Sequence, residues 1–139
     1  MRAETYHALG DYGHEIADYT EAIRLYPNYG LFYKSRGLAY GALRQYEKEI
    51  ADLTKAIGGL FVDPKELYYN RGLTYATLRR YESAIRDYTQ VIKEWSPGMY
   101  DQIYLKAYES RGKAYEAIGN KKAANADLEK VRQLGAPKN

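Results

Sequence analysis

Apolar and small residues recur along the chain with the three- and four-residue spacing of one helix face. Around Gly37, Tyr33 lies four residues before the glycine and Tyr40 three residues after it, so these side chains share a face. A short polar joint follows. The same helical spacing then resumes at Tyr46, Ile50, Leu53, Ala56 and Ile57. The pattern predicts two helices joined by a tight turn.

This helix pair is repeated along the chain. Three segments align on Gly37, Gly72 and Gly112, and a partial copy with Ala3 at the same place precedes them. Glycine in the middle of a helix costs about 1 kcal/mol relative to alanine, so its recurrence predicts that the paired helices approach closely there. Twelve of the 17 tyrosines occupy repeat positions: Tyr6, Tyr12, Tyr19, Tyr33, Tyr40, Tyr46, Tyr68, Tyr75, Tyr81, Tyr88, Tyr108 and Tyr115.

Prolines mark the breaks between the repeats. Asp63, Pro64 and Glu66 form a helix-start signal, with Asp63 as the N-cap. The stretch 96–105 exceeds the period by about six residues, and we interpret it as a lengthened first helix with a kink or loop near Pro97. We expect a single domain, 1–139, with repeats at about 1–29, 30–63, 64–97 and 98–134. In this division the first repeat is truncated and the polar last helix can serve as an end cap.

A repeat of about 34 residues with two helices, Arg-Gly after an aromatic residue, and tyrosine three residues on resembles the tetratricopeptide repeat. The resemblance implies an all-α fold, a right-handed α-solenoid of about four antiparallel helix hairpins whose first helices line a concave groove. Glu15 and Glu49 stand where the family prefers a small residue, a departure that concerns the tightness of packing rather than the fold.

Each repeat also carries an arginine and an aspartate 16 residues apart. If the two helices are antiparallel, these side chains meet across the hairpin, and we predict an ion pair in every repeat. A structural pair that locks the hairpin is favoured over a row of arginines that captures an acidic ligand. The pairs are Arg2 with Asp18, Arg36 with Asp52, Arg71 with Asp87, and Arg111 with Asp127.

The first helices present a second face, opposite to the tyrosines and glycines, that we predict to bind a peptide. Its middle is apolar and its rims carry charges of both signs, which favours a protein segment with a bulky apolar anchor. The alternative is that Leu38 and Leu73 pack against neighbouring helices. The predicted groove residues are Leu31, Lys34, Ser35, Leu38, Glu66, Tyr69, Asn70, Leu73, Lys106, Ser110 and Lys113.

Two further interaction modes stay open. Some tetratricopeptide domains clamp an acidic C-terminal tail, as co-chaperones do, and the resemblance matches Lys34, Asn70 and Lys106 to that clamp. Leu38 and Ser110 depart from it, because the clamp has an asparagine and an arginine there. The other mode is self-association into a homo-oligomer through exposed end faces of the terminal repeats.

Composition narrows the function to a non-enzymatic interaction scaffold. The 139 residues exclude a multidomain enzyme, and the absence of cysteine excludes disulfides and thiolate chemistry. The net charge of +3 with both signs interspersed argues against nucleic acid, no apolar run reaches membrane length, and we expect a cytoplasmic protein. Neither a catalytic motif nor metal-ligand spacing is present, so we expect no cofactor and interpret His7 and His14 as solvated or packing residues.

Overall fold

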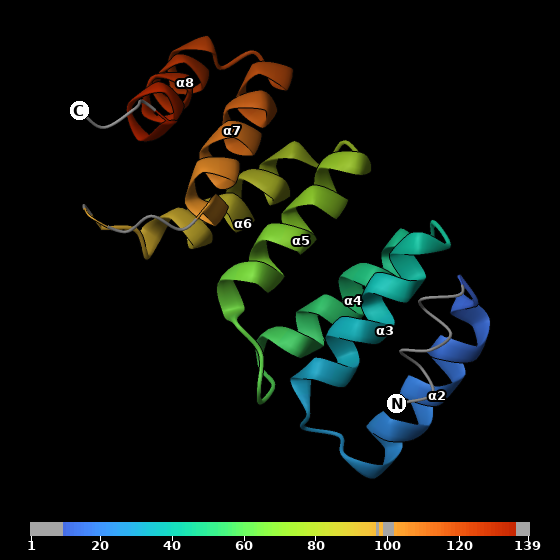
Figure 1. Ribbon diagram of the computed structural model, residues 1–139. Coiled ribbons are helices and arrows are strands. Elements are labelled where there is room, and N and C mark those ends of the chain that lie inside the picture. The colour runs from blue at the N-terminus through green and yellow to red at the C-terminus, as the bar shows by residue number, and fades with distance from the viewer. Residues whose placement is uncertain (1–9, 97, 99–101, 136–139) are drawn as a thin grey trace. The chain divides into compact units, whose positions relative to one another are not determined.

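The computed structural model describes residues 10–96, 98 and 102–135, and seven α-helices account for most of them (Figure 1). The described residues contain no strand apart from an isolated bridge between Tyr29 and Leu60. None of the helices in this part of the chain has the length and apolar character needed to cross a membrane. The helices are α2 (Tyr12–Leu25), α3 (Gly30–Ala42), α4 (Tyr46–Ile57), α5 (Pro64–Thr77), α6 (Tyr81–Lys93), α7 (Gln102–Ala117) and α8 (Lys121–Gly135).

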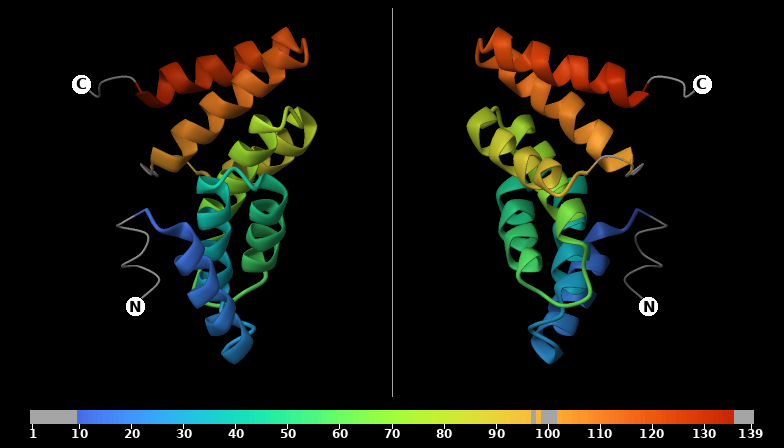
Figure 2. Two further views of the ribbon diagram at one scale, coloured as in Figure 1. Left: turned by 90° about the vertical axis from the view of Figure 1, so that its right-hand side faces the viewer. Right: turned by 90° about the vertical axis from the view of Figure 1, so that its left-hand side faces the viewer.

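The chain forms two compact units, Met1–Leu67 and Tyr68–Asn139. In the first unit α3 packs against both α2 and α4, and in the second α7 packs against both α6 and α8. Both views of Figure 2 show α7 and α8 side by side as a hairpin. Helix α5 begins in the first unit and continues in the second. Consecutive antiparallel helices are therefore the building block of each unit.

The helix boundaries follow local signals in two places. At the start of α5 the Lys65 amide donates a 3.0 Å hydrogen bond to Asp63 Oδ1, which confirms Asp63 as the N-cap. Helix α7 has 16 residues against 13 in α3, so the first helix of the last repeat is longer, but it begins only at Gln102. Of the stretch interpreted as lengthened, Ser96 and Gly98 precede that helix.

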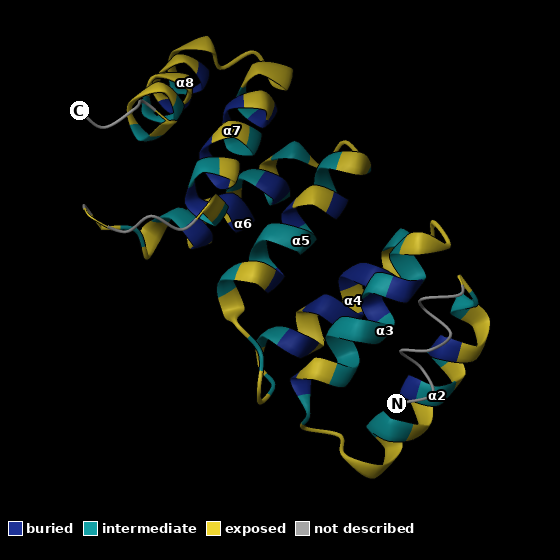
Figure 3. Cartoon of the chain, in the orientation of Figure 1, coloured by how far each residue is buried: buried dark blue, intermediate teal, exposed yellow. Residues whose placement is uncertain are grey.

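Each unit has its own hydrophobic core, which appears dark blue in Figure 3. In the first unit, side chains of α4 and the start of α5 form a fully buried cluster of Leu53, Ala56 and Leu67. In the second unit, α6 and α7 contribute the cluster of Val91, Tyr104 and Ala107. The helices of each unit are therefore held together mainly by apolar burial at their mutual contacts.

The recurring glycines lie where the two helices of a hairpin touch. A Cβ atom added to Gly72 would lie 2.7 Å from Cε1 of the buried Tyr88. An added Cβ would lie 3.1 Å from the Asp52 Cβ at Gly37, and 3.3 Å from the Asp127 Cβ at Gly112. The predicted close approach is confirmed.

The departure from the family pattern at Glu49 is accommodated within the same hairpin. Glu49 is buried, and a Cβ added to Gly41 would lie only 2.6 Å from its carboxylate. The missing side chain at Gly41 therefore leaves the space that this carboxylate fills, and α3 and α4 pack closely despite the large residue. Glu15 of α2 is also buried.

Candidate peptide-binding site

The best-defined polar arrangement in each hairpin centres on the repeat arginine. Arg71 Nε donates to Asp87 Oδ2 at 2.8 Å and Nη2 donates to Oδ1 at 2.7 Å, a two-pronged pair between α5 and α6. The Arg71 side chain is 16% exposed and the Asp87 side chain 5%. The pair is therefore largely removed from water.

The same geometry recurs in two other repeats. Arg36 binds Asp52 between α3 and α4, and Arg111 binds Asp127 between α7 and α8, each with two hydrogen bonds of 2.7–2.8 Å. The structure therefore brings together three of the four predicted pairs. Asp18 lies on α2, and its predicted partner Arg2 lies outside the described residues.

Two tyrosines of its own helix flank each of these arginines. The Arg71 guanidinium lies 5.5 Å from the Tyr68 ring centroid and 5.8 Å from that of Tyr75. Arg36 and Arg111 have the same two neighbours at 5.5–5.8 Å, Tyr33 with Tyr40 and Tyr108 with Tyr115 respectively. Cation–π contact and cover from solvent therefore explain why tyrosine recurs three residues before and four residues after the arginine.

In two of these arginines the remaining guanidinium nitrogen, Nη1, bonds to a different hairpin. Arg36 Nη1 donates to Thr20 Oγ1 on α2, and Arg111 Nη1 donates to Thr89 Oγ1 on α6, both at 3.1 Å. Each threonine hydroxyl donates in turn to a backbone carbonyl of its own helix at 2.7 Å, which leaves its oxygen free to accept. These arginines therefore connect their own hairpin to the preceding one.

Sequence reasoning did not identify these threonines, although a signal was present. Thr20, Thr54 and Thr89 each follow a repeat aspartate by two residues. This spacing of aspartate and threonine can be interpreted only when the neighbouring hairpin is known, because the arginine–threonine hydrogen bond joins side chains of different repeats.

The electrostatics favour a structural role for the arginines. Hydrogen bonds to Asp52 and Asp87 raise the pKa values of Arg36 and Arg71, while burial opposes the rise. For Arg111 burial is the largest single influence and lowers the pKa, but the Asp127 carboxylate together with Tyr115 and Tyr108 gives a net rise. In Arg36 and Arg111 the nitrogens Nε, Nη1 and Nη2 all hold partners, so these guanidinium groups offer little to an acidic ligand.

In the first compact unit the predicted peptide-binding face contains an exposed leucine and an ion pair. Leu31 on α3 is 40% exposed, whereas Ser35 and Leu38 are half-buried. Lys34 Nζ lies 2.9 Å from Glu66 Oε1 at the start of α5. The charge of this lysine is therefore already matched by a carboxylate from the neighbouring hairpin.

In the second unit the predicted residues divide between exposed and packing positions. Leu73 is 39% exposed and Asn70 is half-buried on α5. Lys106 and Lys113 are exposed on α7, and Lys113 lies 3.4 Å from Glu109. Leu73 is thus an apolar side chain that the fold leaves open to solvent.

Two predicted face residues in this unit touch the hairpin interior instead. Tyr69 packs against the core cluster, and its ring centroid lies 6.0 Å from that of Tyr88. Burial raises the pKa of Tyr88, the neighbouring Tyr69 raises it further, and a hydrogen bond from Ser110 opposes the rise. The Ser110 hydroxyl and one side of the Tyr69 ring are therefore engaged within the protein.

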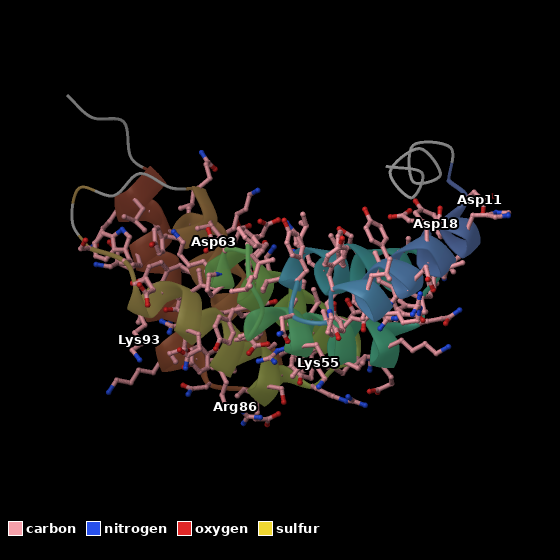
Figure 4. All side chains as sticks on the ribbon, turned by 90° about the horizontal axis from the view of Figure 1, so that it is seen from below. Asp11, Asp18, Lys55, Asp63, Arg86 and Lys93 are labelled. Atoms are coloured by element: carbon pink, nitrogen blue, oxygen red, sulfur yellow. The ribbon has the colours of Figure 1, made fainter. Side chains whose placement is uncertain are left out.

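The second helices α4 and α6 expose charged side chains. Lys55 on α4 and Arg86 and Lys93 on α6 point away from the ribbon into solvent (Figure 4). Within residues 10–96, 98 and 102–135, no cluster of three or more histidine, cysteine, aspartate or glutamate side chains could hold a metal ion. On α4 and α6 the large exposed side chains are therefore charged or polar, whereas α3 and α5 also expose the leucines Leu31 and Leu73.

Known proteins share this repeat pattern and this arrangement of helical hairpins. The sequence profile of the tetratricopeptide repeat matches residues 1–29 and 65–94. A crystal structure of the MamA protein is 26% identical with a TM-score of 0.82, over 95% of this chain and 68% of that one. A MamA structure from Desulfovibrio magneticus is 20% identical with a TM-score of 0.78, over 96% of this chain and 71% of that one. No curated protein is a significant sequence match.

A third solved structure adds a functional description of its own protein. YrrB, reported as a TPR protein with an unusual peptide-binding site, is 16% identical with a TM-score of 0.60, over 95% of this chain and 82% of that one. Together the similarities confirm the expected fold class, an all-α solenoid of helical hairpins. The profile match over these two segments and the shared fold therefore support a tetratricopeptide repeat protein, and proteins of that repeat family generally serve as non-catalytic scaffolds for protein interactions.

Proposed function

We propose that the chain binds a peptide or protein segment along the faces that the first helices α3, α5 and α7 turn away from their glycines. The observation that carries the proposal is the exposure of Leu73 and Leu31, near 40%, on helices whose opposite faces are buried. The exposed part of each leucine contributes nothing to folding, whereas covering it with a ligand recovers apolar burial. The second helices offer charged side chains instead.

The charges beside these leucines favour a ligand with an apolar anchor and no large net charge. Lys34 is paired with Glu66, and Lys113 lies close to Glu109, so both lysines already have acidic neighbours. A strongly acidic ligand would have to compete with these carboxylates. For a segment with one or two anchors we expect an affinity near micromolar, about −8 kcal/mol.

The same contacts count against the clamp for an acidic C-terminal tail. Its first lysine, Lys34, is neutralised by Glu66, and the place that needs an arginine holds Ser110, which bonds to Tyr88. An internal segment anchored by apolar side chains fits better than a terminal carboxylate. The peptide-binding site named for YrrB supports peptide recognition by this fold in general terms.

Selection of peptides from a random display library, followed by calorimetry of the selected sequences, tests the proposal. Selected peptides should share a bulky apolar residue, and Leu73→Glu should weaken their binding at least about tenfold, because a buried unpaired carboxylate replaces an apolar contact. The matched control is Leu128→Glu on α8, where the leucine is equally exposed at 38% and should not matter. Equal binding by wild type and Leu73→Glu would refute the proposed face.

A further inference from the structure

The most exposed apolar side chains in the described chain lie outside the first-helix faces. Leu25, Tyr26, Leu60 and Phe61 are between 56% and 71% exposed, Phe61 most of all. Leu25 ends α2, and Tyr26 follows it in the connection to α3, residues 26–29. Leu60 and Phe61 lie in the connection between α4 and α5, residues 58–63, and both connections belong to the first compact unit. We call this group, with Tyr29 and Phe32, the aromatic edge.

The two connections are fixed to each other rather than independent. The Gly30 amide donates to the Leu60 carbonyl, and the Leu60 amide donates to the Asn28 carbonyl, both at 3.0 Å. The Tyr29 ring centroid lies 4.7 Å from that of Phe61 and 4.8 Å from that of Phe32. The exposed side chains therefore sit on a preformed support, which lowers the entropy lost when they bind.

Phe61 combines a strained backbone with a largely exposed ring. Its φ is +61°, in the left-handed region that a bulky residue rarely adopts. Glycine would fit the same turn without this strain, and the phenylalanine ring stays 71% exposed despite its contact with Tyr29. An external contact made by the ring would account for both the strain and the exposure.

The edge carries no charge of its own. Residues 25–32 and residues 56–62 contain no Asp, Glu, Lys or Arg. A surface without charge can face a copy of itself without like-charge repulsion, as a two-fold symmetric contact requires. The edge exposes roughly 500 Å², so two copies would bury about 1,000 Å² in total, which is near the lower limit for a specific interface.

We propose that the aromatic edge pairs with the aromatic edge of a second copy of the chain, forming a weak two-fold dimer centred on Phe61 and Tyr26. This contact does not rest on the proposed peptide-binding face, because it uses none of those residues. It also differs from association through the end faces of terminal repeats, because Leu60 and Phe61 lie in the connection between α4 and α5, outside the terminal repeats.

Sedimentation velocity from about 1 µM to about 1 mM tests the pairing, with a dimer expected to appear toward the upper part of that range. Phe61→Gly should raise the dimer dissociation constant at least about tenfold while leaving the melting temperature of the dilute monomer equal or higher, since glycine relieves the left-handed strain. Tyr26→Glu should weaken the dimer without such relief.

The matched control is Leu73→Glu, which should weaken peptide binding at least about tenfold and leave the dimer intact. A chain that stays monomeric at the highest concentration would overturn the proposal. So would a dimer that survives Phe61→Gly and Tyr26→Glu, or one that Leu73→Glu alone dissociates. In the last case the first-helix face, not the aromatic edge, would be the contact between copies.

Discussion

The turn between α3 and α4 and the turn between α7 and α8 have one backbone geometry but different local sequences. In both, an amide after the turn donates at 2.9 Å to a tyrosine carbonyl five residues earlier, Gln45 to Tyr40 and Asn120 to Tyr115. The left-handed residue is Gly119 in the second turn, with φ +81°, but Arg44 in the first, with φ +59°. The first turn therefore carries strain that the second avoids.

The helices that follow these two turns also differ at their N-termini, because only α8 has a side-chain cap. Asn120 Oδ1 accepts a hydrogen bond from the Ala123 amide, so α8 has a side-chain cap, whereas Gln45 makes no such bond to α4. The turn between α5 and α6 resembles the first, with Arg79 at φ +58° and an uncapped start at Arg80. Tertiary contacts must therefore hold the α3–α4 and α5–α6 turns in a shape that their own residues disfavour.

The largest loss of stability should come from removing the arginine–aspartate pair of a hairpin whose turn is strained. Asp87→Ala leaves the Arg71 charge largely buried without its carboxylate, and we expect a loss of about 3–5 kcal/mol in the free energy of unfolding. Urea denaturation followed by circular dichroism measures it. Thr89→Ala, which removes one outer hydrogen bond to Arg111, is the matched control and should cost about 1 kcal/mol. Equal losses in the two variants would contradict a structural role for the Arg71–Asp87 pair.

A smaller effect should follow from filling the contact at the repeat glycine. Gly72→Ala places a methyl group 2.7 Å from the Tyr88 ring, which is fully buried and has little room to move, so we expect a loss of about 1–3 kcal/mol. Gly112→Ala meets its nearest atom at 3.3 Å and should cost less, or even gain from the better helix propensity of alanine. Thermal melts of both variants decide the ranking, and the reverse order would contradict it.

These two predictions rest on features that can be recognised in the sequence alone. The 16-residue separation of arginine and aspartate and the recurrence of glycine are internal repeats, and a repeated pattern in antiparallel helices fixes which side chains meet. The peptide-binding residues could be predicted less well. Tyr69 and Ser110 share a helix face with exposed positions in the pattern, yet both contact Tyr88, and a helical period alone does not reveal how far a side chain leans toward the next helix.

Other features carried no usable local signal. Nothing in the residues around Arg44 or Phe61 indicates a left-handed backbone, because such a conformation in a non-glycine residue is imposed by the surrounding fold. The compensation between Glu49 and Gly41 is similar, because it joins residues on two helices whose exact separation is a tertiary property. Local sequence thus predicts the helices well and the strained connections poorly.

Exchanging the turn residues should sharpen the comparison directly. Gly119→Arg places a side chain at φ +81° in the α7–α8 turn, and we expect a loss of about 1–2 kcal/mol. Asn120→Gln in the same turn removes the cap on Ala123 and should cost about 1 kcal/mol. Because Gly119 and Asn120 are adjacent, the double variant tests their coupling, and urea denaturation gives all three values. No loss for Gly119→Arg would mean that φ is not the origin of the difference.

The smallest effect should come from the reverse exchange. Arg44→Gly relieves the left-handed strain in the α3–α4 turn, but glycine also gives the unfolded chain more freedom, so we expect a net gain of only about 0.5 kcal/mol. Arg44→Ala is the matched control, because it removes the same charge and keeps the Cβ atom that causes the strain. If alanine stabilised the chain as much as glycine, the gain would come from charge, and the strain assigned to this turn would be wrong. If glycine alone stabilises it, the α3–α4 turn is held in place by the packing of its helices.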